Sequence, residues 1–211
     1  MANNNLFILY KDGWKYISIS ISTSIVLSIF SLHTLAFISL LLTGIFIFIF
    51  RNPERLFPVF ESSSLVSPVD GVVLSIEEID NSEFAYRLKI DSTIFDVGIL
   101  RVPMSAKVES LHYTKGTKVA TKSTLHSDLN EAIYLTFVNN NADRVKVIHR
   151  LKESFIPLFI DIKASQEVYQ TTRYGFVNNT MTTLYIPNNF RLNVSVGSDL
   201  KASESLLGYF S

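Results

Sequence analysis

Two short motifs in the first half of the chain contain the side chains best suited to chemistry. Arg51 and Arg55 flank the run Asn52-Pro53-Glu54, and a planar guanidinium matches the oxygens of a phosphate group. Further along, Ser67-Pro68-Val69-Asp70-Gly71 combines one carboxylate with a proline and a glycine, which favour a turn. We therefore consider the arginines as candidate phosphate ligands or interface anchors, and Asp70 as a turn residue or a catalytic group.

The composition argues against several other chemistries. The chain has 211 residues and no cysteine, which excludes disulfides, thiol nucleophiles and cysteine metal ligands. No histidine, aspartate or glutamate residues have the spacing of a metal site, so no metal is expected. Lys plus Arg and Asp plus Glu number 19 each. Because no basic cluster is present either, we expect no nucleic-acid partner.

Residues 16–50 form an apolar segment without a charged side chain. As one helix, at about 1.5 Å per residue, the segment would reach roughly 50 Å, beyond the ~30 Å hydrocarbon core of a bilayer. The polar run Ser31-Leu32-His33-Thr34 predicts a break that leaves two helices, near 17–30 and 35–50. Two lysines precede the segment and two arginines follow it, which favours both ends on the cytoplasmic side. We expect a hairpin in one leaflet, with a single tilted span as the alternative.

The rest of the chain reads as β structure. Short runs rich in β-branched and aromatic residues alternate with turn residues such as Lys115-Gly116 and Asn139-Asn140-Asn141. We predict a mainly β soluble domain over 59–211, after an N-terminal membrane-associated helical segment over 1–58. The run 194–207 is similar to the hairpins of barrel-sandwich folds, so a barrel-sandwich-like domain is expected. The predicted strands cover 71–76, 85–90, 94–100, 132–137, 145–148, 155–162, 182–186 and 192–196.

Taken in order, these features resemble the short form of phosphatidylserine decarboxylase, the pyruvoyl enzyme that makes phosphatidylethanolamine. The resemblance covers nearly the whole chain in register. It implies a protein of phospholipid metabolism on the cytoplasmic face of the bacterial inner membrane, with membrane phospholipids as partners. Besides the paired apolar runs, the matching stretches are 50–55 with Pro58, 67–71, 110–113 with Gly116, 130–131, 173–175, 184–187 and 194–210.

The match fails at the residues that the family uses for chemistry. The resemblance implies that a pyruvoyl group forms from the serine of a Gly-Ser pair, just before a strand similar to Leu184-Tyr185-Ile186-Pro187. Here the corresponding stretch, 176–183, is one residue short and contains no Gly-Ser pair. Thr180 is its nearest hydroxyl. Elimination from a threonine would leave a 2-oxobutanoyl group instead of a pyruvoyl group.

A second departure concerns the self-cleavage triad that the resemblance implies, in which a histidine and an aspartate act with the serine. Gly98 stands at the position of the histidine and cannot move a proton, whereas Asp70 is kept. A base must lie within hydrogen-bond reach of the proton it takes. His112, His126 and His149 meet this condition only if the fold brings one of them there.

Two main hypotheses follow. In the favoured one, the chain is a catalytically inactive relative that forms no pyruvoyl group and serves in headgroup binding or in pairing with another subunit, as a homo- or hetero-oligomer. In the other, it is an active phosphatidylserine decarboxylase that uses Thr180 as an atypical precursor, with Asp70 assisting cleavage. An unrelated membrane-tethered β module is a third interpretation.

Overall fold

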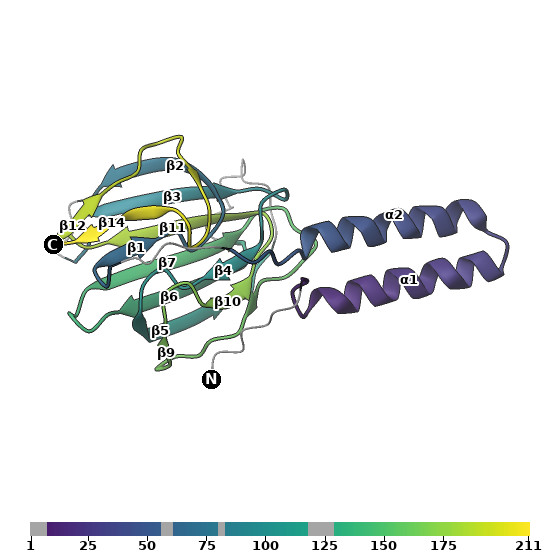
Figure 1. The fold of residues 1–211 in the computed structure, drawn as a ribbon, viewed down its shortest axis with the longest axis horizontal. Helices are drawn as coiled ribbons and strands as arrows, with labels where there is room; N and C mark the ends of the chain where they lie inside the picture. Colours follow the sequence, from purple (N-terminus) through teal and green to yellow (C-terminus); the bar gives the residue numbers. More distant parts are fainter. Residues whose placement is uncertain (1–7, 56–60, 80–82, 118–128) are drawn as a thin grey trace. The chain divides into compact units, whose positions relative to one another are not determined.

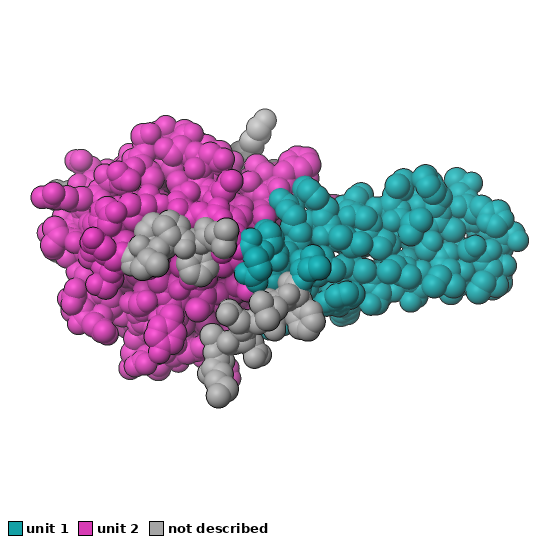
Figure 2. Space-filling model, in the orientation of Figure 1, with its two compact units in different colours: residues 1, 3–54 teal, residues 2, 55–211 magenta. Residues whose placement is uncertain are grey.

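The computed structural model describes residues 8–55, 61–79, 83–117 and 129–211. The chain divides into two compact units, one formed by residues 1 and 3–54 and the other by residues 2 and 55–211 (Figure 2). The domain boundary expected after Pro58 lies outside the described residues. Each unit is considered by itself below.

The first unit is a pair of helices, α1 (Gly13–Ile29) and α2 (His33–Ile49) (Figure 1). The predicted break between two helices is confirmed, and Ser31 turns the chain there with a φ of 60°. At the other end of the pair, the Tyr10 N–H donates to the Phe50 carbonyl over 2.9 Å. No helix in the described part of the chain is long and apolar enough to cross a membrane.

Hydroxyl groups line the contact between the two helices. Ser20 Oγ donates to the Ser39 carbonyl and Ser39 Oγ donates to the Ser20 carbonyl, both over 2.8 Å. Thr43 Oγ1 donates to Ser20 Oγ over 2.9 Å, and these three side chains are buried. The outward faces carry large apolar side chains instead, among them Ile19, Ile25, Ile29, Phe30, Leu35, Phe37, Leu40 and Leu41. This distribution is the reverse of that expected for a helix pair in water.

In its described residues, the second unit contains three antiparallel sheets (Figure 1). The largest has eight strands in the order β13-β2-β3-β11-β7-β6-β5-β9, and the two others have the orders β1-β14-β12 and β4-β10-β8. The mainly β prediction is therefore confirmed. The strands are β1 (Ser64–Val66), β2 (Gly71–Glu78), β3 (Tyr86–Ser92), β4 (Ile99–Arg101), β5 (Ala106–Thr114), β6 (Ala132–Val138), β7 (Arg144–Leu151), β8 (Phe159–Ile160), β9 (Glu167–Val168), β10 (Arg173–Phe176), β11 (Thr180–Ile186), β12 (Phe190–Leu192), β13 (Asp199–Leu200) and β14 (Leu206–Phe210).

Alternation along the central strands builds the core of this unit. In β11, every second side chain from Thr180 to Ile186 is buried, as expected for a strand with one face on the core. Burying one large apolar side chain contributes about 1.5–3 kcal/mol. The fully buried members of the core include Leu65, Leu88, Ile90, Leu135, Phe137, Val147, Tyr174 and Leu184.

Three strand predictions need correction. Residues 94–98 are not extended, because the Asp96 carboxylate accepts the Thr93 N–H over 2.6 Å and closes a turn, so β4 begins only at Ile99. The run 155–162 contains only the two residues of β8, and the run 192–196 is replaced by β12, which ends at Leu192. Strand β5 was not predicted, because most of its side chains are polar and exposed.

Candidate functional site

Thr180, the predicted precursor residue, begins β11 and is fully buried. Its Oγ1 donates a hydrogen bond of 2.8 Å to the Arg150 carbonyl on the neighbouring strand β7. Its Cα lies opposite Leu151 of β7 on one side and opposite Ser92 of β3 on the other. The hydroxyl therefore sits at one end of the eight-stranded sheet, between two strands.

Asn179, directly before Thr180, has a left-handed backbone with a φ of 56°. Glycine adopts this conformation most readily, and asparagine is among the few other residues that tolerate it. The Asn179 carbonyl accepts the Lys152 N–H over 2.9 Å, and its side-chain amide donates to the Glu153 carbonyl over 2.6 Å. The peptide bond before the threonine is thus held in a turn by two contacts with the segment that follows β7.

Asp70 lies at the same end of the sheet, just before β2, and is buried. Its Oδ2 accepts a hydrogen bond from the Arg55 guanidinium at 2.5 Å, and its Oδ1 accepts one from the Ala202 N–H at 2.8 Å. Its backbone carbonyl accepts Ser92 Oγ, and Ser92 pairs with Thr180. The fold brings the two predicted catalytic residues to one sheet end, but both carboxylate oxygens already have structural partners.

The two arginines are placed differently. The Arg55 side chain is 8% exposed and contacts Asp70, with longer contacts to the Ala202 carbonyl and the Glu204 carboxylate. Arg51, in the helical unit, donates to the Phe48 carbonyl over 2.9 Å and stacks on the Phe48 ring at 4.1 Å. Phosphate binding by either arginine stays a prediction.

Gly98 occupies a position with no room for a side chain. A Cβ atom there would lie 2.4 Å from the Val177 carbonyl oxygen and 2.8 Å from the Phe176 ring. The Val177 N–H also donates to the Gly98 carbonyl over 2.8 Å, which holds the two segments together. A histidine at this position would require the backbone at Val177 to move.

The other histidines in the described part of the β unit do not replace it. His149 is fully buried in β7, where its Nδ1 bonds to Thr182 Oγ1 at 2.8 Å and its Nε2 to the Tyr174 hydroxyl at 2.6 Å. Burial lowers the pKa of His149 to about 3, so the ring is neutral at physiological pH. His112 lies exposed on β5, and His126 lies outside the described residues. Both ring nitrogens of His149 therefore form hydrogen bonds within the core, two residue pairs away from Thr180 in the register of β11 and β7.

Other motif residues gather at the same end of the sheet. Asn130 Nδ2 donates to the Leu151 carbonyl over 2.8 Å, beside the threonine. The Glu131 carboxylate accepts the Tyr113 hydroxyl and, over 3.2 Å, the Leu158 N–H. Burial and this carboxylate raise the pKa of Tyr113 to about 12. The stretches 110–113 and 130–131 thus meet near Thr180.

The site also contains residues that the sequence did not single out. Lys152 is buried and its ammonium pairs with Asp91 at 2.5 Å, at the ends of β7 and β3. Residue types alone do not predict this site residue, because the Lys152 ammonium pairs with Asp91 of β3 while its backbone N–H donates to the Asn179 carbonyl. In the described part of the chain, no group of three or more metal-binding side chains occurs.

The residues present do not fit the pyruvoyl group that the resemblance implies. That group requires a serine, and the buried hydroxyl at the turn belongs to a threonine. The space of the implied histidine is filled by the Val177 carbonyl and the Phe176 ring. Among the described residues, no ionisable side chain forms a hydrogen bond with the Thr180 hydroxyl, whose partner is the Arg150 backbone carbonyl. Among the described residues, positions 180 and 98 therefore supply neither the serine precursor nor the histidine base that the resemblance implies.

Comparisons with known proteins identify the relatives of this chain. The family model for phosphatidylserine decarboxylase matches residues 42–208. A phosphatidylserine decarboxylase proenzyme from Desulfotalea psychrophila is 27% identical, over 94% of this chain and 94% of the relative. Proenzymes of the same name from Geotalea uraniireducens and Ehrlichia chaffeensis are 28% and 26% identical, over 99% of this chain and 99% and 94% of their own lengths. No solved structure matches. Because the family model covers most of the chain and the relatives align along nearly all of it, the chain belongs to the phosphatidylserine decarboxylase family.

Proposed function

We propose that this chain is a membrane-associated, phosphatidylserine decarboxylase-like protein of phospholipid metabolism that does not cleave itself and has no decarboxylase activity. It keeps the β fold for binding phospholipid headgroups or for pairing with another subunit, at the cytoplasmic face of the bacterial inner membrane. The single observation that carries the proposal is the packing of Gly98, where a Cβ would lie 2.4 Å from the Val177 carbonyl.

The packing around Gly98 matters more than the missing histidine alone. Contacts below 3.0 Å to a backbone oxygen cannot be relieved by rotating a side chain. A single substitution would therefore not restore the base, because Val177 is also held by its hydrogen bond to Gly98. The threonine at position 180 adds a second, independent obstacle.

The contacts of Asp70 explain why this residue remains when the others are gone. A buried carboxylate is costly unless it is paired and hydrogen-bonded, and Asp70 has Arg55 and the Ala202 N–H. These contacts connect the residue before β2 to the C-terminal hairpin. Loss of the aspartate would leave the buried Arg55 guanidinium with only its longer contact to the Glu204 carboxylate, at 3.5 Å, so folding alone accounts for the retention of Asp70.

The helical unit supports the membrane part of the proposal. In hydrocarbon, hydroxyls are best satisfied against each other or against backbone carbonyls, as in the Ser20–Ser39 pair, while Ile, Leu and Phe face the lipid. Each helix has 17 residues, about 25 Å. The end of the pair that is remote from the turn at Ser31 carries Trp14, Lys15 and Arg51. Aromatic and cationic side chains at such a position suit the headgroup layer.

The intact mass of the full-length protein, purified in detergent, tests the absence of self-cleavage. We expect one uncut chain of 23.9 kDa. Prolonged incubation should produce no fragments, and Thr180→Ala should give the same uncut pattern. Two fragments that separate between residues 179 and 180, and that disappear in Thr180→Ala, would overturn the proposal.

One observation favours the alternative function, an active phosphatidylserine decarboxylase with Thr180 as precursor. The Asn179 backbone is left-handed and its carbonyl accepts the Lys152 N–H, which polarises the bond that a threonine hydroxyl would attack. The mass experiment separates the two functions. The alternative predicts a C-terminal fragment 180–211 with a blocked N-terminus, together with release of CO2 from phosphatidylserine vesicles.

A further inference from the structure

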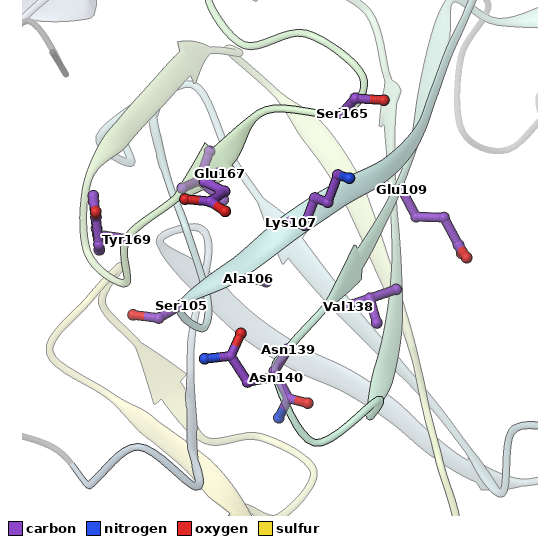
Figure 3. Close-up of a pocket in the computed structure, with 11 residues that line it drawn as sticks. Ser105, Ala106, Lys107, Glu109, Val138, Asn139, Asn140, Ser165, Glu167 and Tyr169 are labelled. Carbon is purple, nitrogen blue, oxygen red and sulfur yellow. The ribbon is translucent and has the colours of Figure 1, made fainter.

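A groove of about 680 Å³ is lined by residues of β5, β6 and β9 and of the turns beside them (Figure 3). It lies at the opposite end of the eight-stranded sheet from Asp70 and Thr180. Thr180 is opposite the end of β7, which pairs with the beginning of β6. The groove instead lies where β5 begins and β6 ends, with Lys107 opposite Val138. It is therefore separate from the site described above.

The groove has an apolar floor and a polar rim. Three apolar residues line it, of which Ala106 and Val168 are buried and Val138 is half-buried. Its volume lies within the range of roughly 300–1,000 Å³ that small-molecule sites occupy, and such sites combine apolar walls with a few polar groups. The chemistry of the rim therefore indicates what the groove can hold.

Two opposite charges of the rim are not paired with each other. Lys107 of β5 and Glu167 of β9 are directly opposite in the strand register, yet no ion pair joins them or engages either one in the described part of the chain. Glu109, also on the rim, is different because Arg144 binds its carboxylate. Figure 3 shows the Lys107 and Glu167 side chains directed to different parts of the groove.

Neutral polar and aromatic side chains also line the groove beside the two charged residues. Asn139 uses its amide within its own turn, binding Asp143 and the Asn141 N–H, whereas the Asn140 amide and the Ser165 hydroxyl, which also line the groove, have no hydrogen-bond partner among the described residues. Tyr169, which lies on the side of Glu167, is 68% exposed. An aromatic ring and a carboxylate together suit an ammonium group. A lysine with hydroxyl and amide donors suits a phosphate or carboxylate.

We propose that this groove binds a small zwitterion, with its ammonium group at Glu167 and Tyr169 and its anionic group at Lys107. The ligand is an amine joined by a short linker to a phosphate or carboxylate, which occurs both as a free metabolite and as a phospholipid headgroup. The proposal does not depend on self-cleavage, since no residue of the groove belongs to the processing site.

The test uses the full-length protein in detergent and O-phosphoethanolamine as the probe, with binding measured by calorimetry. We expect saturable binding that Lys107→Met and Glu167→Gln each weaken about tenfold, a loss of about 1.4 kcal/mol. Lys201→Met and Glu61→Gln, which change exposed charges of the same type outside the groove, should leave the affinity unchanged. Equal melting temperatures would show that the variants fold.

Ethanolamine alone and inorganic phosphate alone should each bind at least about tenfold more weakly than the probe. Absence of saturable binding, or phosphate binding as tightly as the zwitterion, would overturn the proposal. Competition by vesicles of phosphatidylethanolamine would identify the headgroup as the source, and its absence would identify the free molecule. Both results are compatible with the groove, and neither depends on whether the chain is cut.

Discussion

Acid should destabilise the β unit through His149, a fully buried side chain. Burial lowers its folded-state pKa to about 3 from the ordinary 6.5. The unfolded chain therefore takes up a proton that the folded chain excludes, and stability is lost as the pH falls from 6.5 toward 3. From pH 7.5 to pH 5, these two pKa values correspond to a loss of about 2 kcal/mol in the free energy of unfolding.

The assay is denaturant unfolding of the full-length protein in detergent at several pH values between 5 and 7.5, followed for the wild type and His149→Gln. Glutamine can replace the hydrogen bonds to Thr182 and Tyr174 but does not titrate, so the difference between the two proteins should shrink by about 2 kcal/mol at pH 5. His112→Gln, at an exposed position of β5, is the matched control.

An identical pH dependence of unfolding in the wild type and His149→Gln would refute the reasoning. If His149→Gln does not fold, the ring can be followed directly in the wild type by nuclear magnetic resonance. A ring that becomes protonated in the folded protein near pH 6.5 would refute it equally, since burial would then not exclude the proton.

Three further predictions concern other parts of the molecule. Arg55→Met and Asp70→Asn should each lower the free energy of unfolding by about 3–5 kcal/mol, and the double variant by clearly less than their sum; additive losses would mean that the pair is not coupled. Ser203→Gly should stabilise the protein by about 1 kcal/mol in a melting experiment, because Ser203 has a φ of 67° and a buried hydroxyl without a partner among the described residues; an unchanged or lower melting temperature would contradict this. Fluorescence from Trp14, the single tryptophan, should shift to the blue with vesicles and be quenched more by shallow than by deep brominated lipids; no quenching by either would remove the hairpin from the membrane.

Local patterns were enough to predict the main classes of structure. The polar run at residues 31–34 interrupts an apolar segment too long for one helix, and the chain turns there at Ser31. Alternating β-branched and aromatic residues identified β2, β3, β6, β7 and β11, because a strand with one buried face has a period of two. Local patterns did not predict strand β5, since its exposed face is polar and it is held by pairing with β6 and β9.

The order of motifs along the chain indicated the family, and the residue types at positions 98 and 180 showed where the chain departs from the family pattern. Only the tertiary structure decided what those changes mean. Whether Gly98 could be replaced by a larger residue depends on Val177, nearly eighty positions away. Whether the Asp70 carboxylate has partners depends on Arg55 and Ala202. Likewise, His149 has a lowered pKa because the sheet buries it completely. Distances, burial and hydrogen-bond partners arise from long-range packing, which residue types and spacing alone do not specify.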